Sequence, residues 1–273
     1  MKSKASRLNF DALLHTALIA SVAVMLSACA GTYSNPSTTL NATVLSKERI
    51  AEIIASPDRS ATDRGQDEQR KPDEMLTFIG VRPGMVALDL SAGGGYTTEL
   101  LSRAVGLSGR VYGQSAPRAP SSSQRLTSPQ ALTERAKNRQ VANIIPVVRK
   151  FEDPVPPEVT AGGLDLVTLI FNYHDLGHMG VDRSRMNSAV FAALKSGGLY
   201  VIADHSGRLG TGISEAATLH RIEEAFMRKE VEDAGFKLVG QGSFWRNPSD
   251  LRDKNTPDRS QPKDGFVLKF VKP

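Results

Sequence analysis

The stretch from Val86 to Tyr96, VALDLSAGGGY, constrains the fold of this chain more than any other. It begins with an apolar segment that is typical of a buried strand, and this segment leads through an aspartate into a run of glycines. A helical pattern, Tyr96–Ala104, follows at once. In such a turn a ligand approaches the backbone closely and meets the free N–H groups of a helix N-terminus. The stretch therefore predicts a nucleotide-type binding site.

Strand and helix patterns alternate along the chain, which favours a parallel sheet covered by helices on both faces. Strands such as Leu166–Phe171 are continuous apolar runs, as expected where both faces of a sheet are buried. The predicted strands are Met85–Leu90, Arg110–Gly113, Asn143–Val148, Leu164–Phe171, Gly198–Ala203, Lys237–Gly240 and Phe266–Val271. The predicted helices are Ser46–Ala55, Arg64–Ile79, Tyr96–Ala104, Gln130–Arg139, Arg183–Leu194 and Glu215–Ala234, the last with Ser214 as N-cap and Gly235 as C-cap.

The N-terminus is predicted to be an export signal. A basic start precedes an apolar run, Ala17–Leu26, which is shorter than the roughly 20 residues of a membrane-spanning helix. The single cysteine, Cys29, directly follows Leu-Ser-Ala, and this pattern resembles the lipobox of bacterial lipoproteins, in which the chain is cut before a lipid-modified cysteine. We expect a lipoprotein signal peptide over residues 1–28, a flexible tether over 29–45 and a folded domain over 46–273. An ordinary signal peptide with an incidental cysteine is the alternative.

Charge and cysteine content restrict the partners and the location. The formal charge is +5 and basic residues alternate with acidic ones, so we expect no nucleic-acid partner. A single cysteine forms no disulfide within the chain. Ala30 follows Cys29, and the lack of an aspartate there resembles the Gram-negative lipoproteins that are sent to the outer membrane. We therefore expect an exported protein with a small-molecule substrate, anchored by its lipid at the periplasmic face of the outer membrane.

Two kinds of cofactor compete for the glycine-rich turn. A dinucleotide fingerprint needs Gly-x-Gly-x-x-Gly and an acid at the end of the second strand, but Thr98 and Gln114 stand at those positions. The stretch LDLSAGGGY instead resembles motif I of class I S-adenosylmethionine-dependent methyltransferases, hydrophobic-Asp-x-Gly-x-Gly-x-Gly. Three positions match this motif and one differs: Asp89, Gly93 and Gly95 agree, and Ser91 replaces the first glycine.

The resemblance implies roles for further residues. In that family the aspartate holds the turn and the methionine end of S-adenosylmethionine, and an acid ends the second strand. Gln114 stands in its place, and its amide hydrogen-bonds a ribose hydroxyl without the charge-assisted contribution of about 1 kcal/mol or more. Glu152 and Asp153 follow the third strand, where family members often place an acid near the adenine; a solvated turn is the alternative for both. The implied cofactor-binding set is Asp89, Ser91, Gly93, Gly95, Gln114, Glu152, Asp153 and Asn172.

Asn, Tyr, His and Asp follow the fourth strand directly. In an open α/β sheet, groups just beyond the carboxyl end of a strand face the ligand crevice. His174 or His205 is a candidate base beside the methyl acceptor, because imidazole titrates near neutral pH. Asp175 or Asp204 is a candidate to orient that histidine, and Asn172 and Tyr173 are candidates to bind the cofactor's amino-acid end or the acceptor. For each histidine the alternative is a polar residue that fixes a loop. The predicted catalytic set is His174, Asp175, Tyr173 and His205.

A metal site is a less favoured interpretation of the same cluster. Imidazole and carboxylate groups suit several divalent ions, and the spacing of His174 and His178 fits a helix. Gly177 and Gly180 argue against a helix there, so we predict no metal. Hydrolases and NTPases are not favoured either, because the nucleophile elbow and the P-loop are missing. The candidate metal ligands are His174, Asp175, His178, Asp204 and His205.

Longer stretches resemble a group of bacterial predicted methyltransferases that are often exported. They are RKPDEMLTFIGVRPG, FNYHDLGHMGVDRSRMN, the sequence ADHS that ends at Ser206, TLHRIEEAF and GFVLKFVKP. The resemblance covers nearly all of residues 47–273. It implies a Rossmann-like, seven-stranded, mostly parallel sheet with an antiparallel last strand, preceded by an N-terminal helical extension.

For function, the resemblance implies methyl transfer from S-adenosylmethionine to an unidentified, small-molecule acceptor. The first alternative is a non-catalytic periplasmic ligand-binding lipoprotein that keeps this fold. Ser91 and Gln114 weaken the motif, and export removes the domain from the cytoplasmic synthesis of the cofactor. An NAD-dependent oxidoreductase is a second alternative, which Thr98 and Gln114 disfavour.

Overall fold

The computed structural model describes residues 43–118, 126–159, 162–258, 261 and 263–273, and these residues belong to one compact unit. The predicted signal peptide, Cys29 and most of the predicted tether lie outside the described residues, so these predictions and the domain boundaries stay untested. No helix in the described part of the chain has the length and apolar character needed to cross a membrane.

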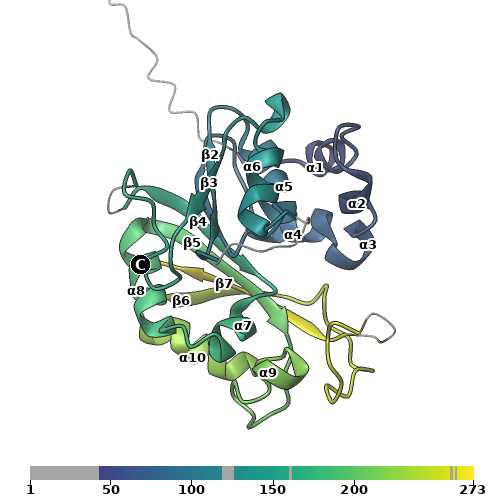
Figure 1. Cartoon of the computed structure of the whole chain (residues 1–273), viewed down its shortest axis with the longest axis vertical. Helices are drawn as coiled ribbons and strands as arrows, with labels where there is room; N and C mark the ends of the chain where they lie inside the picture. The colour runs from purple at the N-terminus through teal and green to yellow at the C-terminus, as the bar shows by residue number, and fades with distance from the viewer. Residues whose placement is uncertain (1–42, 119–125, 160–161, 259–260, 262) are drawn as a thin grey trace, which may run out of the picture. The chain divides into compact units, whose positions relative to one another are not determined.

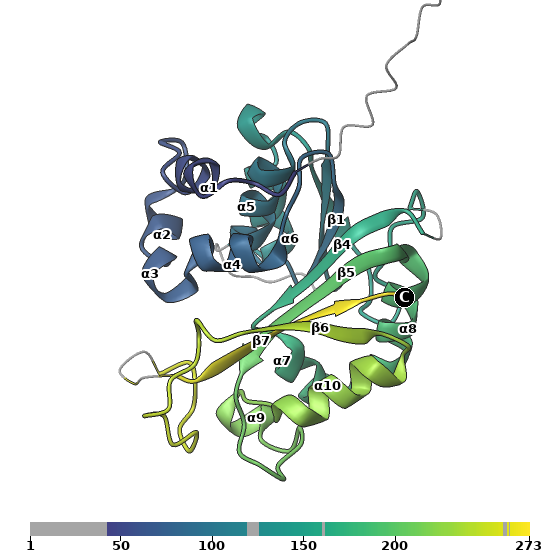
Figure 2. The ribbon, with the colours of Figure 1, turned by 180° about the vertical axis from the view of Figure 1, so that it is seen from behind.

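A seven-stranded sheet in the order β3-β2-β1-β4-β5-β7-β6 forms the centre of the fold (Figure 1, Figure 2). The strands from β3 to β5 are parallel, and β7 runs antiparallel to both of its neighbours, β5 and β6. This confirms the predicted sheet with its antiparallel last strand. The strands are β1 Val86–Leu90, β2 Arg110–Ser115, β3 Ile144–Val148, β4 Leu164–Ile170, β5 Leu194–His205, β6 Lys237–Gly242 and β7 Gly265–Val271.

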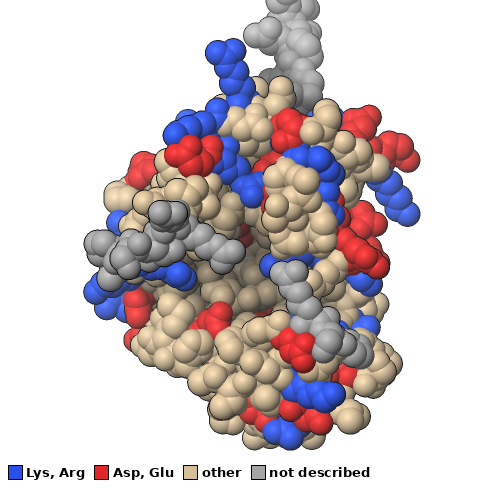
Figure 3. Space-filling model, turned by 45° about the vertical axis from the view of Figure 1, so that its right-hand side comes forward, with Lys and Arg blue, Asp and Glu red and all other residues tan. Residues whose placement is uncertain are grey.

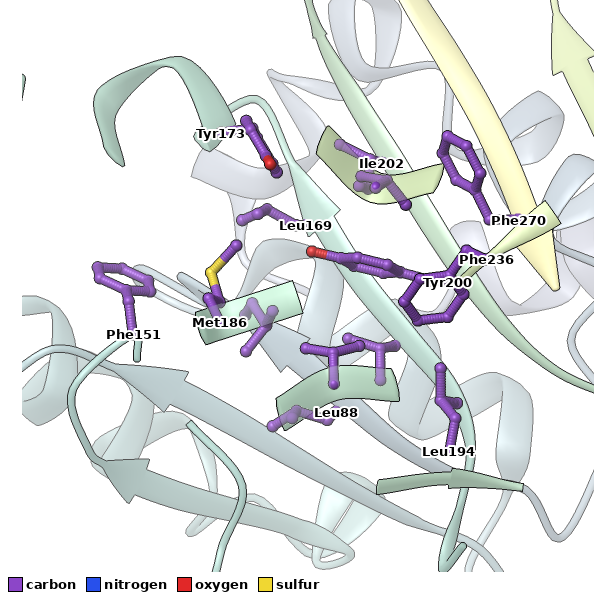
Figure 4. Close-up of a cluster of buried hydrophobic side chains, with 14 of the residues drawn as sticks. Leu88, Phe151, Leu169, Tyr173, Met186, Leu194, Tyr200, Ile202, Phe236 and Phe270 are labelled. Carbon is purple, nitrogen blue, oxygen red and sulfur yellow. The ribbon is translucent and has the colours of Figure 1, made fainter. Parts of the chain in front are cut away.

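Helices cover both faces of this sheet (Figure 1). Alternate residues of β1 point to opposite faces: Ala87 packs in the apolar cluster with α1, α4 and α5, and Leu88 packs in the cluster with α7, α8 and α10. Figure 4 shows the second cluster, in which Tyr173, Met186 and Tyr200 lie together. The helices are α1 Lys47–Ile54, α2 Ala61–Arg64, α3 Asp67–Arg70, α4 Pro72–Ile79, α5 Tyr96–Val105, α6 Ser128–Arg135, α7 Tyr173–His178, α8 Arg183–Ala193, α9 Ala216–Leu219 and α10 Glu224–Asp233, and a 3-10 turn spans Arg139–Val141.

The single helix predicted over Arg64–Ile79 is wrong. The chain instead forms α2, α3 and α4 in succession. Lys71 separates α3 from α4 in a left-handed conformation with φ 45°, and Pro72 starts α4 at the first helical position, where its missing N–H costs nothing. The break turns the end of α3 toward the carboxyl edge of the sheet, where Arg70 lines two cavities described below.

The long helix predicted over Glu215–Ala234 is also wrong. It is divided at His220, which has φ 51°. Beyond the break the chain is extended beside the end of β5: the N–H of Ile222 donates to the carbonyl of His205 at 3.1 Å, and Ile222 accepts from Gly207 at 2.7 Å. Tertiary hydrogen bonds thus override a helical hydrophobic pattern.

The expectation that Gly177 and Gly180 prevent a helix after β4 is wrong, because α7 forms there. Gly177 lies inside α7, and a Cβ atom at this position would come within 2.5 Å of Ile213. A glycine is needed at this position because α7 packs closely against the segment before α9. Gly177 therefore has a packing role within the helix and does not mark its end. Shorter differences are that β2 extends two residues further, to Ser115, and that α8 ends before Leu194, where β5 begins.

Candidate functional site

Three adjoining cavities lie at the carboxyl edge of the sheet, where the strand order reverses between β1 and β4. Ligands bind at such reversal points in open α/β sheets. Figure 3 shows the molecule hollowed near the middle of one face. The turn cavity, about 670 Å³, is lined by Asp89, Ser91, Gly93, Tyr96, Arg70 and Phe171. The histidine cavity, about 430 Å³, is lined by His174, His205, His220, Trp245, Arg70 and Phe171. The edge cavity, about 220 Å³, is lined by Ser91, Gly93, Ser115, Phe151, Asn172 and Asp175.

The glycine-rich turn between β1 and α5 has a left-handed backbone at three positions. Ser91, Gly93 and Gly95 all have positive φ, at 53°, 58° and 89°. Gly95 has a packing role, because a Cβ atom there would lie 2.6 Å from the Leu132 side chain. At Gly93 a Cβ atom would meet nothing closer than 3.9 Å and would point into open space. The turn therefore lets a ligand approach the backbone at Gly93.

Asp89 is buried at the centre of the turn and joins three elements. It accepts hydrogen bonds from Thr98 of α5 at 2.6 Å and from Thr168 of β4 at 2.7 Å. Burial raises the pKa of Asp89 to about 6, although both threonine hydrogen bonds lower it. Thr98 thus has a structural role at the position where a dinucleotide fingerprint has glycine.

The residue at the end of β2 is Ser115, one position beyond Gln114. Gln114 is fully buried: its Oε1 accepts from the N–H of Ser91 at 3.0 Å, and its Nε2 donates to the carbonyl of Arg149 at 2.7 Å. Ser115 lines the edge cavity, and its buried Oγ has no hydrogen-bond partner among the described residues. The structure therefore places the Gln114 side chain in the support of the turn, and Ser115 at the cavity.

Glu152 and Asp153 are not brought to the three cavities. Glu152 accepts from the N–H of Asp182 at 3.4 Å, and Asp153 forms an ion pair with Arg149. The residue of this segment that lines the edge cavity is Phe151.

Asn172 lies where the turn and edge cavities meet. It accepts a hydrogen bond from the Ser91 hydroxyl, and its Nδ2 donates to Asp175 at 2.6 Å. Ser91 thus supplies a contact that glycine, the usual residue of the motif, lacks.

His174 is held between two carboxylates. Its Nδ1 lies 2.6 Å from Asp204 and its Nε2 lies 3.2 Å from Asp175, and the residue is only 3% exposed. Burial lowers the pKa of His174, but the two carboxylates outweigh it and raise that pKa to about 10. At neutral pH the ring is therefore protonated on both nitrogens and has no lone pair with which to accept a proton.

His205 is in the opposite state. Its ring stacks on Phe171 with centroids 4.8 Å apart and makes no hydrogen bond to another described residue. Burial lowers the pKa of His205 to about 4, although Asp204 raises it. The imidazole is therefore neutral at pH 7 and presents a lone pair to the histidine cavity. Phe171 has φ 56°, a strained conformation for a bulky residue that is typical of functional sites.

Tyr173 does not line any of the three cavities. It is fully buried under α7, and its hydroxyl lies 3.0 Å from both Glu230 and Asn187. Because neighbouring residues of a helix point in different directions, α7 directs His174 to the cavity and Tyr173 into the core.

Several lining residues were missed by the sequence interpretation. They come from segments far apart in the chain, and although Arg70, Phe171 and His220 lie in stretches that carry the family resemblance, nothing in those stretches gave them a role at a site, so only the fold brings them together. The one that a local signal marked is Ser115, since the strand pattern of β2 continues past Gly113. These residues are Arg70, Ser115, Phe171, His220 and Trp245.

Within the described ranges, no group of three or more His, Cys, Asp and Glu side chains is arranged to hold a metal ion. The helix α7 does place His174 and His178 one turn apart. However, both ring nitrogens of His174 already face carboxylates, so neither nitrogen is directed toward His178 to share a metal ion with it.

Solved structures with the same fold support a class I methyltransferase architecture. A S-adenosylmethionine-dependent methyltransferase from Aquifex aeolicus has a TM-score of 0.54 and 16% identity, with 83% of this chain and 98% of that chain covered. Geranyl diphosphate C-methyltransferase from Streptomyces coelicolor, in complex with S-adenosyl-L-homocysteine, has a TM-score of 0.56 and 14% identity over 81% of this chain and 84% of that one. The cyclase SpnF has a TM-score of 0.55 and 14% identity over 78% and 82%. No family model matches the sequence, and the comparison with curated proteins gives no match. At these identities the likeness shows the fold.

Proposed function

We propose that this protein transfers a methyl group from S-adenosylmethionine to a small-molecule acceptor. The observation that carries this proposal is the pair of joined cavities at the carboxyl edge of the sheet. The first surrounds a glycine-rich turn with open space beside Gly93, and the second contains a neutral imidazole, His205. Arg70 and Phe171 line both cavities, so two ligands bound there would be neighbours.

The residues of the turn and edge cavities fit an adenosyl ligand. The open backbone at Gly93 allows a close approach, and the unpartnered Oγ of Ser115 can hydrogen-bond a ribose hydroxyl or a base nitrogen. Phe151 offers an aromatic ring to a purine. Asn172 lies at the junction of the two cavities, where its hydrogen bonds to Ser91 and Asp175 fix the wall beside the ligand.

Bound S-adenosylmethionine would supply an electrophilic methyl carbon, whose bond to sulfur breaks as a lone pair of the acceptor attacks. His205 is the group that would accept the proton released by the acceptor, because it is neutral and its ring has no other partner. His174 would act differently: as a cation whose two ring N–H groups face Asp175 and Asp204, it would fix Asp175 at the wall of the cavity and would not take the proton.

The second candidate function is a binding protein that keeps the fold without transfer activity. SpnF shows that a similar fold can belong to a protein named for a cyclase activity. In this chain β2 ends in Ser115 and not in an acid. A hydroxyl forms a weaker hydrogen bond to a ribose hydroxyl than a carboxylate does, so we expect weaker binding of the ribose. A radiolabelled methyl-transfer assay with candidate acceptors separates the two functions, since both bind the adenosyl ligand.

We further propose that the protein acts outside the cytoplasm, anchored through Cys29 at the periplasmic face of the outer membrane. The basic start, the short apolar run and the single cysteine after Leu-Ser-Ala support this location.

Titration of the full chain with S-adenosylhomocysteine, S-adenosylmethionine and NAD by calorimetry tests the cofactor. We expect micromolar binding of both adenosyl ligands and none of NAD, because Thr98 fills the third glycine position of the dinucleotide fingerprint. No heat and no thermal shift with either adenosyl ligand at millimolar concentration would refute the proposed function.

Replacing Ser115 with alanine should weaken S-adenosylhomocysteine binding about 5- to 10-fold, which corresponds to one hydrogen bond of about 1 kcal/mol. The free energy of unfolding should not fall, because the Oγ has no partner among the described residues. Chemical denaturation and calorimetry measure the two effects. Ser108→Ala, at an exposed position that lines none of the three cavities, is the matched control and should change neither quantity. Unchanged affinity in Ser115→Ala would place the ligand elsewhere.

A further inference from the structure

We propose that the histidine cavity binds a planar aromatic molecule that carries an acidic group. This inference rests on the proposed function in one respect: the molecule would be the methyl acceptor or occupy the acceptor's place. Its support comes from the walls of the cavity and from the charges that face it.

The walls of the histidine cavity are aromatic. Phe171 stacks on His205 at an interplanar angle of 25°, and Trp245 meets Phe171 edge-on with ring centroids 4.7 Å apart. The His220 ring stands edge-on to His174 at 5.6 Å. Aromatic walls favour flat, unsaturated ligands over aliphatic ones, because stacked or edge-on ring pairs stabilise binding beyond the area that they bury. A volume of about 430 Å³ accommodates a small ring compound.

Arg70 is the cation without a counter-charge at this site. Its guanidinium lies 5.3 Å from the centre of the Phe171 ring and 5.6 Å from that of Tyr96, and no carboxylate of the described residues lies within ion-pair distance. Three neighbouring arginines differ in this respect, since each has at least one carboxylate partner: Arg59, Arg103 and Arg135. Burial lowers the pKa of Arg70, so its charge is poorly solvated. A bound anion would supply the missing partner.

The other charges of the histidine cavity also favour an anion. Asp175 is the only carboxylate among the described lining residues, and it already pairs with His174. The cations that line the cavity are Arg70, Lys263 and the His174 imidazolium. Because Asp175 and Asp204 both already pair with His174, an acidic group of the ligand that reaches Arg70 would meet that cation with no carboxylate of the described residues within ion-pair distance.

Arg70 also lines the turn cavity, so the carboxylate of the adenosyl ligand's amino-acid end is a second source of the same chemistry. The two sources differ in what they predict. If Arg70 binds the acidic group of the acceptor, its replacement weakens the binding of aromatic acids and leaves the binding of S-adenosylhomocysteine unchanged. If Arg70 binds the cofactor, its replacement weakens the binding of S-adenosylhomocysteine and leaves the binding of aromatic acids unchanged.

The test uses the full chain and three probes: 4-hydroxybenzoate, its neutral isostere 4-hydroxybenzamide, and cyclohexanecarboxylate, which has the charge without the aromatic ring. Calorimetry is performed with saturating S-adenosylhomocysteine and again without it, so that the outcome does not depend on adenosyl binding. We expect 4-hydroxybenzoate to bind at least 10-fold more tightly than either of the others. Equal or weaker binding of 4-hydroxybenzoate than of either probe would overturn the proposal, whereas failure of S-adenosylhomocysteine to bind would refute only the proposed function.

The variant Arg70→Met tests whether Arg70 binds the acidic group of the aromatic molecule. We expect it to lower the affinity for 4-hydroxybenzoate at least 10-fold, whereas the affinities for 4-hydroxybenzamide and S-adenosylhomocysteine change less than 2-fold. Arg110→Met, at an exposed position at the start of β2, is the matched control and should change none of them. A loss of S-adenosylhomocysteine affinity with unchanged 4-hydroxybenzoate affinity would overturn the proposal. If Arg70→Met does not fold, the comparison of the three probes on the unaltered chain decides the matter.

Discussion

Replacing Asp204 with alanine should lower the free energy of unfolding at pH 7 by about 3–5 kcal/mol, as expected when one partner of a buried ion pair is removed. Asp204 is fully buried and accepts from Nδ1 of His174 at 2.6 Å, from the backbone N–H of His174 at 2.7 Å and from that of His205 at 2.7 Å. Its loss leaves these donors without an acceptor in the protein interior. Urea denaturation followed by circular dichroism measures the change.

The pH dependence identifies the cause. Because the pKa of His174 is raised in the folded protein, its stabilisation is complete below pH 6.5 and is lost as the pH rises toward 10. Asp204→Ala should reduce the slope of stability against pH in this window. Asp175→Asn, which keeps an oxygen near Nε2 of His174, is the control. It should lower the free energy of unfolding less than Asp204→Ala does. Equal slopes in Asp204→Ala and the unaltered chain would show that His174 is not charged by this pair.

The second large effect is expected at the glycine-rich turn. Gly93→Asp should weaken S-adenosylhomocysteine binding at least 100-fold, because the new carboxylate would project into the open space beside the turn. The fold should persist, since a Cβ atom there meets nothing closer than 3.9 Å and aspartate tolerates the left-handed conformation. Calorimetry measures the affinity and thermal unfolding checks the fold.

Gly80→Asp is the matched control for Gly93→Asp. Gly80 also has positive φ, 75°, and open space around a Cβ atom, but it ends α4 and lines none of the three cavities. Both variants carry the same kind of backbone strain, so a loss of binding in Gly93→Asp alone locates the ligand at the turn. Normal affinity in Gly93→Asp would show that the ligand binds elsewhere.

The parts of the fold that could be predicted are those with a strong local pattern. The apolar strand, the aspartate and the glycines of β1 and its turn determine a backbone conformation nearly by themselves, and the buried parallel strands follow from their continuous apolar runs. The antiparallel β7 was predicted by resemblance, because nothing in Gly265–Val271 alone indicates its direction.

The errors arise where distant contacts decide the local structure. The helical pattern across His220 is broken by hydrogen bonds to the end of β5, and Gly177 fits inside a helix because Ile213 packs against it. Gln114 and Ser115 differ by one residue along β2, and in a strand one residue separates the two faces. The extent of the strand therefore decided which side chain lies at the cavity.

The candidate site was predicted in the part that β1, β4 and the end of β5 supply, and it was missed in the part that other segments supply. His174, His205, Asp89 and Gly93 do line the cavities. Arg70 and Trp245 come from α3 and from the segment after β6, and only the assembled sheet brings them to the same place.

The shared wall of the turn cavity and the histidine cavity has a thermodynamic consequence. Phe171 and Arg70 face both, and Phe171 is held in a strained backbone conformation between them. Occupants of the two cavities would touch the same two side chains. If the first occupant shifts them, it changes the affinity for the second by some factor, and linkage requires the second to change the affinity for the first by that same factor. The two cavities would then behave as one coupled binding unit.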